Sequence, residues 1–251
     1  MAVYNSKDGL TVIDDRIGHH SFNPLQRSKG RNALQFASYI TGKTIKDEIL
    51  GKTYGRKKDK GKVIETGIVG PKNLNTNTKE LWSEAEKANT RKNSVVAFES
   101  VYSLPAELSL ERQKALAVGM CLYIRDTYGG ACEFAIHEPD SKALNESQKN
   151  IHIHIMETSN TVKSGRAGEP IFGKKIRELQ NGNRKCRLKD RREEWAKRVN
   201  SELKKAGSNR RIDHRSFIER VKSGDAPNLI ASTHENGRKL RDYERAMSMS
   251  V

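Results

Sequence analysis

The chain has 251 residues, 35% of them hydrophobic and 31% charged, which is enough apolar material for one sizeable domain or two small ones. Lys and Arg outnumber Asp and Glu by 47 to 31, and the net charge of +16 favours a polyanionic partner, nucleic acid before an anionic membrane surface. No apolar run is long enough to cross a bilayer, so we expect no membrane insertion. Three scattered cysteines and a start without a signal-peptide pattern favour a cytoplasmic protein.

The first helix is predicted shortly after a weakly patterned opening, in which Asn23-Pro24 is expected to turn the chain. Ser28 is a suitable N-cap, and the helix should run to about Ile40 and stop at Gly42. Its buried stripe repeats at helical spacing through Ala33, Phe36, Ala37 and Ile40. Tyr39 lies outside this stripe. Its hydroxyl is either an ordinary half-packed surface group or a nucleophile or phosphate contact.

Basic residues flank this helix and fill the loop at residues 51–62. Basic side chains of this kind are usually solvated, but in so basic a chain contact with a phosphate backbone is about equally expected. The candidate DNA-binding residues are Arg27, Lys29, Arg31, Lys43, Lys52, Arg56, Lys57 and Lys58. The loop lacks the spacing of a phosphate-binding P-loop, and its Tyr54 is a second candidate phenol.

The middle of the chain alternates helical and strand-like segments. A short amphipathic helix is expected at 81–88, a strand at 94–102, and a helix capped by Ser109 that ends at Gly129. Residues 163–187 are basic and irregular, typical of a flexible arm, and a helix should follow from about Leu188 to Ala206. This order predicts an α+β fold, with a central antiparallel β-sheet that has helices packed on one face and a histidine site on the other.

The most informative stretch is residues 151–155, where isoleucine and histidine alternate, so that His152 and His154 project from the same face of a strand. A second strand-like run at 132–137 ends on His137, and an antiparallel return would place this residue beside the pair. A His-x-His pair alone is usually a half-exposed polar face. The third histidine, among only seven in the chain, favours a metal site with three nitrogen ligands. Glu99 could orient one of these ligands or simply face solvent.

Four groups of residues, in this order, resemble the MobA/MobL-type (MobQ group) conjugative relaxases of the His-hydrophobic-His endonuclease superfamily. They lie at 31–42, at 104–109, at 135–137 with 150–154, and at 195–216, and together they span about residues 27–216. The last group includes His214, which a structural hydrogen bond explains as well as DNA contact. The loop between His137 and His152 is longer than is usual in this family.

The resemblance implies a bacterial plasmid mobilisation relaxase that nicks and rejoins one strand at an origin of transfer. Tyr39 takes the nucleophile position and forms a 5′-phosphotyrosyl intermediate, and His137, His152 and His154 take the metal-ligand positions. The implied cofactor is Mn²⁺ or Mg²⁺, although imidazoles alone favour Zn, Ni or Cu. The implied partners are single-stranded origin DNA, accessory mobilisation proteins and a type IV secretion coupling protein.

Two other functions remain open from the sequence: a rolling-circle replication initiator endonuclease, or a non-catalytic basic DNA-binding protein with a structural metal. We predict a relaxase domain over residues 1–215 and a C-terminal polar extension over 216–251. Since many relatives continue into further domains, the chain could be a fragment of a longer protein.

Overall fold

A computed structural model of the chain describes residues 2–6, 9–13, 20–55, 62–138, 151–179 and 184–215, with the single residues 219 and 223. The chain forms two compact units, a larger one over His20–Leu188 and a smaller one made of Met1–His19 with Lys189–Val251. The predicted boundary at residue 215 lies inside the smaller unit, and almost all of 216–251 lies outside the described residues. The predicted domain division therefore stays a prediction.

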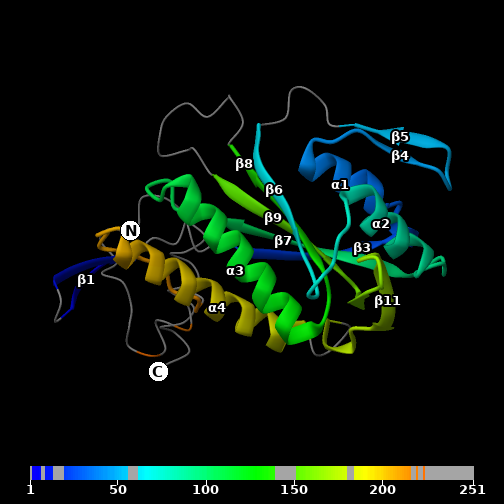
Figure 1. The fold of residues 1–251 in the computed structure, drawn as a ribbon. Helices are drawn as coiled ribbons and strands as arrows, with labels where there is room; N and C mark the ends of the chain where they lie inside the picture. The colour runs from blue at the N-terminus through cyan, green and yellow to red at the C-terminus, as the bar shows by residue number, and fades with distance from the viewer. Residues whose placement is uncertain are drawn as a thin grey trace. The chain divides into compact units, whose positions relative to one another are not determined.

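A five-stranded sheet in which every neighbouring pair is antiparallel forms the centre of the larger unit (Figure 1). Its strand order is β3-β7-β9-β8-β6. The strands are β3 (His20–Gln26), β7 (Val95–Ser103), β9 (His152–Thr158), β8 (Cys132–His137) and β6 (Val63–Val69). The predicted pairing of the two histidine-bearing strands is confirmed, because His137 lies opposite His152.

Both edge strands of this sheet differ from the sequence predictions. Asn23 and Pro24 do not form a turn but continue β3, where they pair with Glu99 and Phe98. Proline is tolerated there because β3 is an edge strand, whose outward side needs no N–H for a ladder. The other edge, β6, is half-buried along its length and was not predicted.

Three helices of the larger unit begin and end at recognisable capping residues. They are α1 (Ala33–Thr41), α2 (Thr78–Lys87) and α3 (Leu110–Tyr128). The N-cap of α1 is Asn32, whose side chain accepts a hydrogen bond from the Gln35 amide. The prediction of Ser28 was wrong, since this residue belongs to a separate single turn, η1 (Arg27–Lys29). The predicted stop at Gly42 is confirmed, with φ at +73°, a left-handed conformation that glycine adopts without strain.

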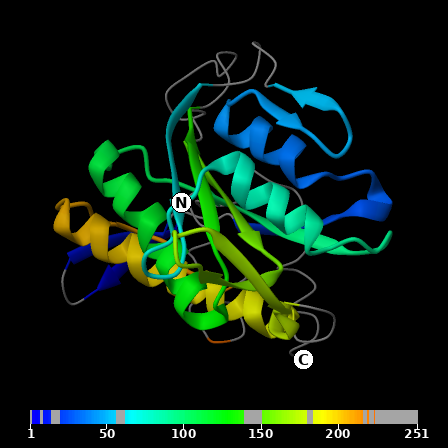
Figure 2. The same cartoon turned by 45° about the vertical axis from the view of Figure 1, so that its right-hand side comes forward.

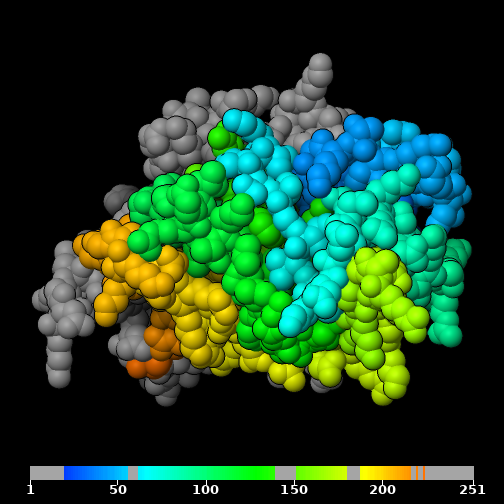
Figure 3. Space-filling model, viewed as in Figure 1, coloured from blue at the N-terminus to red at the C-terminus, as the bar shows by residue number. Residues whose placement is uncertain are grey.

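Helices cover both faces of the sheet (Figures 1 and 2). One face carries the buried side chains Phe134, Ile136, Ile153 and Ile155, and α3, which contacts β6, β8 and β9, packs on it. In the space-filling view α3 and β6 cover the strands behind them (Figure 3). The α+β class, the antiparallel sheet and a helix opposite the histidines therefore agree with the prediction. Its restriction of helices to one face needs correcting, because α1 and α2 lie on the histidine face.

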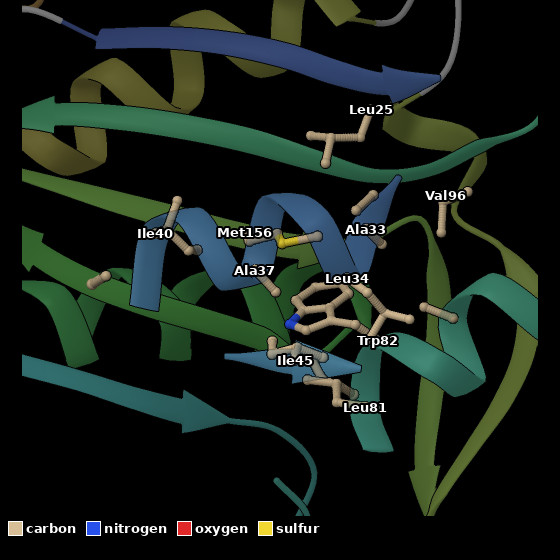
Figure 4. Close-up of a cluster of buried hydrophobic side chains, with 14 of the residues drawn as sticks. Leu25, Ala33, Leu34, Ala37, Ile40, Ile45, Leu81, Trp82, Val96 and Met156 are labelled. Carbon is tan, nitrogen blue, oxygen red and sulfur yellow. The ribbon is translucent and has the colours of Figure 1, made fainter. Parts of the chain in front are cut away.

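The histidine face needs these two helices because part of it is apolar. Ala37 from α1 and Trp82 from α2 belong to one buried cluster with Ala135 of β8 and Met156 of β9. Figure 4 shows the indole of Trp82 among the side chains of α1 and the neighbouring elements. Burial of such apolar surface contributes about 25 cal/mol per Å². This cluster therefore fixes α1 over the sheet next to the histidines.

Two hairpins complete the larger unit. The first joins β4 (Ile45–Asp47) to β5 (Lys52–Tyr54). The second joins β10 (Asn160–Ser164) to β11 (Pro170–Lys175) and is followed by the single turn η3 (Arg177–Leu179). The prediction of a flexible arm at 163–187 was therefore wrong over most of that segment, because a regular hairpin forms there despite its basic composition.

The smaller unit combines a short sheet with most of one long helix. The sheet pairs β1 (Ala2–Ser6) and β2 (Gly9–Ile13) antiparallel, and β12 (Arg210–Arg211) joins β2 in parallel. The helix α4 (Arg184–Lys205) starts earlier than predicted, and Gly207 follows it in a left-handed conformation. The side-chain amide of Asn200 exchanges two hydrogen bonds with the backbone of Ile212. In the described part of the chain, no helix is long and apolar enough to cross a membrane.

Candidate metal centre

Three histidines converge at one end of the histidine face of the sheet. His137, His152 and His154 each offer a ring nitrogen within 4.8 Å of the others. Their ring centroids lie 5.4 Å apart for His137 and His152, 5.0 Å for His152 and His154, and 4.7 Å for His137 and His154. His137 and His154 are buried, and His152 is half-buried. We refer to these three residues as the histidine cluster.

Strand register produces this convergence. His137 ends β8 directly opposite His152, so the two side chains point to the same face. His154 lies two residues along β9 and therefore returns to that face. Its partner on β7 is Val101, and Glu99 lies two residues further along that strand on the same face.

A carboxylate orients one histidine of the cluster. Oε1 of Glu99 lies 2.8 Å from Nδ1 of His154, and both side chains are largely buried. Since a carboxylate accepts hydrogen bonds, the imidazole donates from Nδ1 and leaves Nε2 for another partner. Carboxylates commonly hold metal-ligating histidines in this way. The contact gives Glu99 a partner in the cluster, and its role in orienting a metal ligand stays a prediction.

A backbone carbonyl orients a second histidine. Nε2 of His137 lies 2.6 Å from the carbonyl oxygen of Ile40, which belongs to the last turn of α1. Carbonyls in a last helical turn have no partner within the helix, so His137 satisfies one of them. The carbonyl can only accept, so Nε2 of His137 donates and Nδ1 is the acceptor nitrogen of the neutral ring. Sequence reasoning missed this contact because it involves the backbone of Ile40 and leaves no residue-type signal.

The donor set fits a divalent cation. Three imidazoles have ring nitrogens within 4.8 Å of one another, and a hydrogen bond at one nitrogen orients the rings of His137 and His154. Neutral ligands leave the ion its full positive charge, which suits an anionic substrate. The residues present are therefore suited to hold a metal ion.

Tyr39 lies beside the histidine cluster. Its ring centroid is 6.1 Å from that of His154, edge to face, and Phe36 lies 6.0 Å from Tyr39 and 6.4 Å from His154. The Tyr39 side chain is 37% exposed, so a large substrate can reach it. Because Tyr39 immediately precedes Ile40, the hydrogen bond to His137 ties the position of this phenol to the cluster.

The other candidate phenol has a different environment. Tyr54 packs against the apolar cluster around Trp82. Burial raises the pKa of Tyr54, and the negative charges of Asp47 and Glu86 add to this effect. A raised pKa makes the phenolate harder to form, so Tyr54 is less suited to nucleophilic attack than an exposed tyrosine.

The predicted DNA-binding residues fall into three groups. Arg27 is an ion-pair partner of Glu86 and also donates to its carbonyl at 2.9 Å, and Lys43 donates to Thr78 Oγ1 at 2.8 Å. These two side chains therefore have partners within the protein, and their contact with DNA stays a prediction. Exposed side chains are Lys29, Arg31 and Lys52. Arg56, Lys57 and Lys58 lie outside the described residues.

His214 and Glu86 each make contacts outside the histidine cluster. His214 lies in the smaller unit, with Nδ1 3.9 Å from a carboxylate oxygen of Asp213. The carboxylate of Glu86 accepts a hydrogen bond from the Ala33 amide at 2.7 Å and thus anchors the first turn of α1. Sequence reasoning missed Glu86 because its partners are 53 and 59 residues away in the chain.

Fold and site together define an α+β protein with three histidines grouped as candidate metal ligands on an antiparallel sheet. A profile of the MobA/MobL family matches residues 31–239. The chain belongs to the MobA/MobL family, and the resemblance inferred from its motifs is confirmed.

Relatives agree with this assignment. The chain is similar to Mobilization protein MobL of Acidithiobacillus ferridurans, with 30% identity over 260 residues that cover 91% of this chain and 68% of the relative. It is also similar to Probable mobilization protein MobA of Bifidobacterium longum (strain NCC 2705), with 28% identity over 277 residues. That match covers 93% of this chain and 45% of the relative, so the chain spans under half of the second protein.

The fold also has a counterpart among solved structures. A chain described under "Molecular Basis of Vancomycin Resistance Transfer in Staphylococcus aureus" superimposes with a TM-score of 0.64 and 20% identity, covering 79% of this chain and 98% of the other. This likeness shows the fold.

Proposed function

We propose that this protein is a plasmid mobilisation relaxase that nicks and rejoins one DNA strand at an origin of transfer. The observation that carries the proposal is the position of the exposed Tyr39 ring beside three histidines whose ring nitrogens lie within 4.8 Å of one another. Membership of the MobA/MobL family supports the biological setting. The net charge of +16 suits a polyanionic substrate.

In this proposal the histidine cluster holds a divalent ion, Mn²⁺ or Mg²⁺, through Nδ1 of His137, a nitrogen of His152 and Nε2 of His154. A bound ion would polarise a phosphoryl oxygen and offset the negative charge that develops in the transition state. Glu99 keeps the ring of His154 in the orientation that presents Nε2. The Ile40 carbonyl does the same for His137.

Tyr39 is the proposed nucleophile. Its phenolic oxygen attacks the scissile phosphorus and loses its proton, the bond between phosphorus and the 3′ oxygen breaks, and the 3′ oxygen leaves and takes up a proton. The products are a 5′-phosphotyrosyl link and a free 3′-hydroxyl, and rejoining is the reverse reaction. A free phenol has a pKa of about 10, so Tyr39 must be activated by a nearby positive charge or base. The histidine cluster, next to the ring, is the site from which that activation comes.

The partners follow from this function. We propose single-stranded origin DNA as substrate, with accessory mobilisation proteins and a type IV secretion coupling protein as macromolecular partners. The names of the two relatives, both mobilization proteins, support this assignment.

The test is to incubate the full chain with labelled single-stranded oligonucleotides from the transfer origin of its own genetic element, with Mn²⁺ or with a chelator. We expect a covalent protein–DNA adduct on a denaturing gel that appears only with the ion. Binding without any adduct would instead favour a non-catalytic DNA-binding protein with a structural metal. An adduct formed only on replication-origin DNA would favour a rolling-circle initiator.

A further inference from the structure

A cavity of the larger unit lies far from the histidine cluster. This cavity of about 760 Å³ is bordered by the end of β3, the loop after α2, the start of β7 and the β10–β11 hairpin. Val95 at the start of β7 lines it, whereas the residue opposite His152 is Ser103 at the end of that strand. At about 3.3 Å per residue, the length of β7 separates the two places by roughly 25 Å. We call it the distal cavity.

Lys175 places a positive charge in the wall of this cavity. Its ammonium group donates to the Val95 carbonyl at 2.5 Å and to Ser159 Oγ at 2.7 Å, and in the described part of the chain no carboxylate pairs with it. Burial lowers the pKa of Lys175 to about 8, so the group is still mostly charged at neutral pH. An ammonium has three N–H donors, and two are used by these acceptors. The lysine therefore has both a charge and a donor to offer to a ligand.

A buried acceptor lines the same cavity. Asn89 is 3% exposed, and its Nδ2 donates to the Ala85 carbonyl at 2.7 Å and to Asn160 Oδ1 at 3.1 Å. The orientation of Asn160 is fixed in turn, because its own Nδ2 donates to the Gly173 carbonyl. This leaves Oδ1 of Asn89 buried without a donor in the described structure. A buried acceptor without a partner is unfavourable, so a ligand N–H that reaches it gains a hydrogen bond.

Charge and polarity indicate the chemistry of the ligand. Arg91 adds an exposed guanidinium to the cavity lining, and none of the described lining residues is acidic. Amide side chains from Gln26 and Asn93 complete a polar wall. Cations contact phosphates, and carboxamides both donate to and accept from the edges of nucleobases.

We propose that the distal cavity binds one nucleotide of the substrate DNA strand, with its phosphate toward Lys175 and Arg91 and its base edge toward Asn89. This inference rests on the proposed function in taking DNA as the ligand. It implies that the protein contacts its substrate at two separate places, at the scissile phosphate and at a nucleotide well away from it. A strand that stops close to the nick cannot occupy both.

The test measures DNA affinity in the full chain with Tyr39→Phe, which prevents covalent attachment. The variants are Arg91→Ala, at an exposed position, and Lys175→Met, which keeps the aliphatic stem. The control is Lys72→Ala, an exposed lysine outside the cavity lining. Two single-stranded oligonucleotides are compared, one long enough to reach the distal cavity and one confined to the nick site. Thermal unfolding verifies that each variant is folded.

We expect both cavity variants to bind the long oligonucleotide roughly tenfold more weakly and the short one unchanged. The slope of log Kd against log salt should fall in magnitude by about 0.7 for each phosphate of a single strand that the variant no longer neutralises. Unchanged affinity and slope in Arg91→Ala would overturn the proposal even if Lys175→Met failed to fold. An equally weakened affinity in Lys72→Ala would also overturn it.

Two further arms separate the possible outcomes. A free deoxynucleoside monophosphate that binds at the cavity while long-DNA affinity stays unchanged in the variants would contradict a DNA site. Adduct formation on the short oligonucleotide, measured with the Tyr39-containing protein, tests the proposed nicking reaction without the cavity. Failure of that reaction is therefore distinguishable from failure of the cavity proposal.

Discussion

Two buried polar groups lie on the same face of β8, and their surroundings differ. Glu133 is fully buried, and its two carboxylate oxygens accept hydrogen bonds from Thr78 Oγ1 and, at 2.6 Å, from Trp82 Nε1. Lys43 lies 4.0 Å away. His137, four residues later, has one nitrogen satisfied by the Ile40 carbonyl, and its ring lies against the other two histidines.

The comparison separates structural polar groups from functional ones. Both groups are buried on the face of the sheet that α1 and α2 cover, so burial alone does not distinguish them. Glu133 has its donors within the protein, and its contacts tie α2 to the sheet. The three histidines of the cluster instead bring ring nitrogens within 4.8 Å of one another, an arrangement that suits a metal ion. The grouping of several coordinating side chains, and not burial, therefore marks the candidate site.

The largest effect on nicking should come from removing one histidine of the cluster. In His152→Ala, at the half-buried position of the cluster, we expect nicking to fall by at least about a thousandfold, because the charge beside the scissile phosphate is removed. Adduct formation on origin oligonucleotides in Mn²⁺ measures this. Nicking at the original rate in a folded variant would remove the cluster from the mechanism.

A smaller effect is expected from the carboxylate behind His154. Glu99→Gln should weaken Mn²⁺ binding roughly 10- to 100-fold, because a neutral amide holds the imidazole less firmly than a carboxylate does. Calorimetric titration with Mn²⁺ is the measurement. The matched control is Glu65→Gln on β6, which removes a carboxylate that lies opposite Ile136 of β8 and pairs with Lys114 of α3. Equal weakening in both variants would argue against a specific role for Glu99.

Glu133 should affect stability and leave nicking unchanged. Burial raises the pKa of this carboxyl, against the opposing effects of Thr78, Trp82 and Lys43. Because the pKa of Glu133 is raised in the folded state, this residue contributes fully to the free energy of unfolding below the ordinary pKa of 4.5. That contribution disappears as pH rises through the raised pKa. The free energy of unfolding of the native protein, relative to Glu133→Gln, should therefore decrease from pH 4.5 toward neutrality. Each tenfold change in proton affinity contributes about 1.4 kcal/mol.

Urea unfolding of both proteins across this range gives the difference directly, since other titrating groups cancel. A difference that increases with pH would show that the carboxylate, not the acid, is favoured in the folded protein. Loss of nicking in a Glu133→Gln variant that keeps its full stability would contradict the purely structural role given to Glu133.

The smallest expected effect distinguishes basic residues that stabilise the fold from basic residues that contact DNA. Arg27→Met should lower the free energy of unfolding by about 1–2 kcal/mol, since it leaves buried Glu86 without its ion pair, and Arg27 is one-third exposed, which reduces the effect. It should not change the salt dependence of DNA binding. Lys52→Met, at an exposed position, should leave the free energy of unfolding unchanged. It should lower the slope of log Kd against log salt by about 0.7 in magnitude if Lys52 contacts a phosphate. Denaturant unfolding and DNA titrations at several salt concentrations measure the pair.

Local patterns predicted much of the site. Isoleucine–histidine alternation predicted β9, and the third histidine at the end of β8 predicted the convergence, because strand geometry fixes which side chains share a face. The cap at Ser109 and the stop at Gly129 predicted α3 for the same reason, since capping is a local interaction. Glu99 was a candidate because it lay on the adjacent strand.

Features that depend on tertiary contacts were not predictable in this way. Pro24 is compatible with β3 only because that strand is an edge, which is a property of the whole sheet. The burial of α1 and α2 against the histidine face depends on contacts such as Trp82 with Glu133, 51 residues apart. The ion pair between Arg27 and Glu86 likewise has no local signal, because the two residues are 59 positions apart in the chain.

The most direct test of the central claim is to isolate the covalent adduct formed with origin DNA, digest it with protease and nuclease, and identify the modified peptide by mass spectrometry. The account predicts a nucleotide attached through phosphate to Tyr39, with none on Tyr54. Attachment to Tyr54 or to another residue would contradict it.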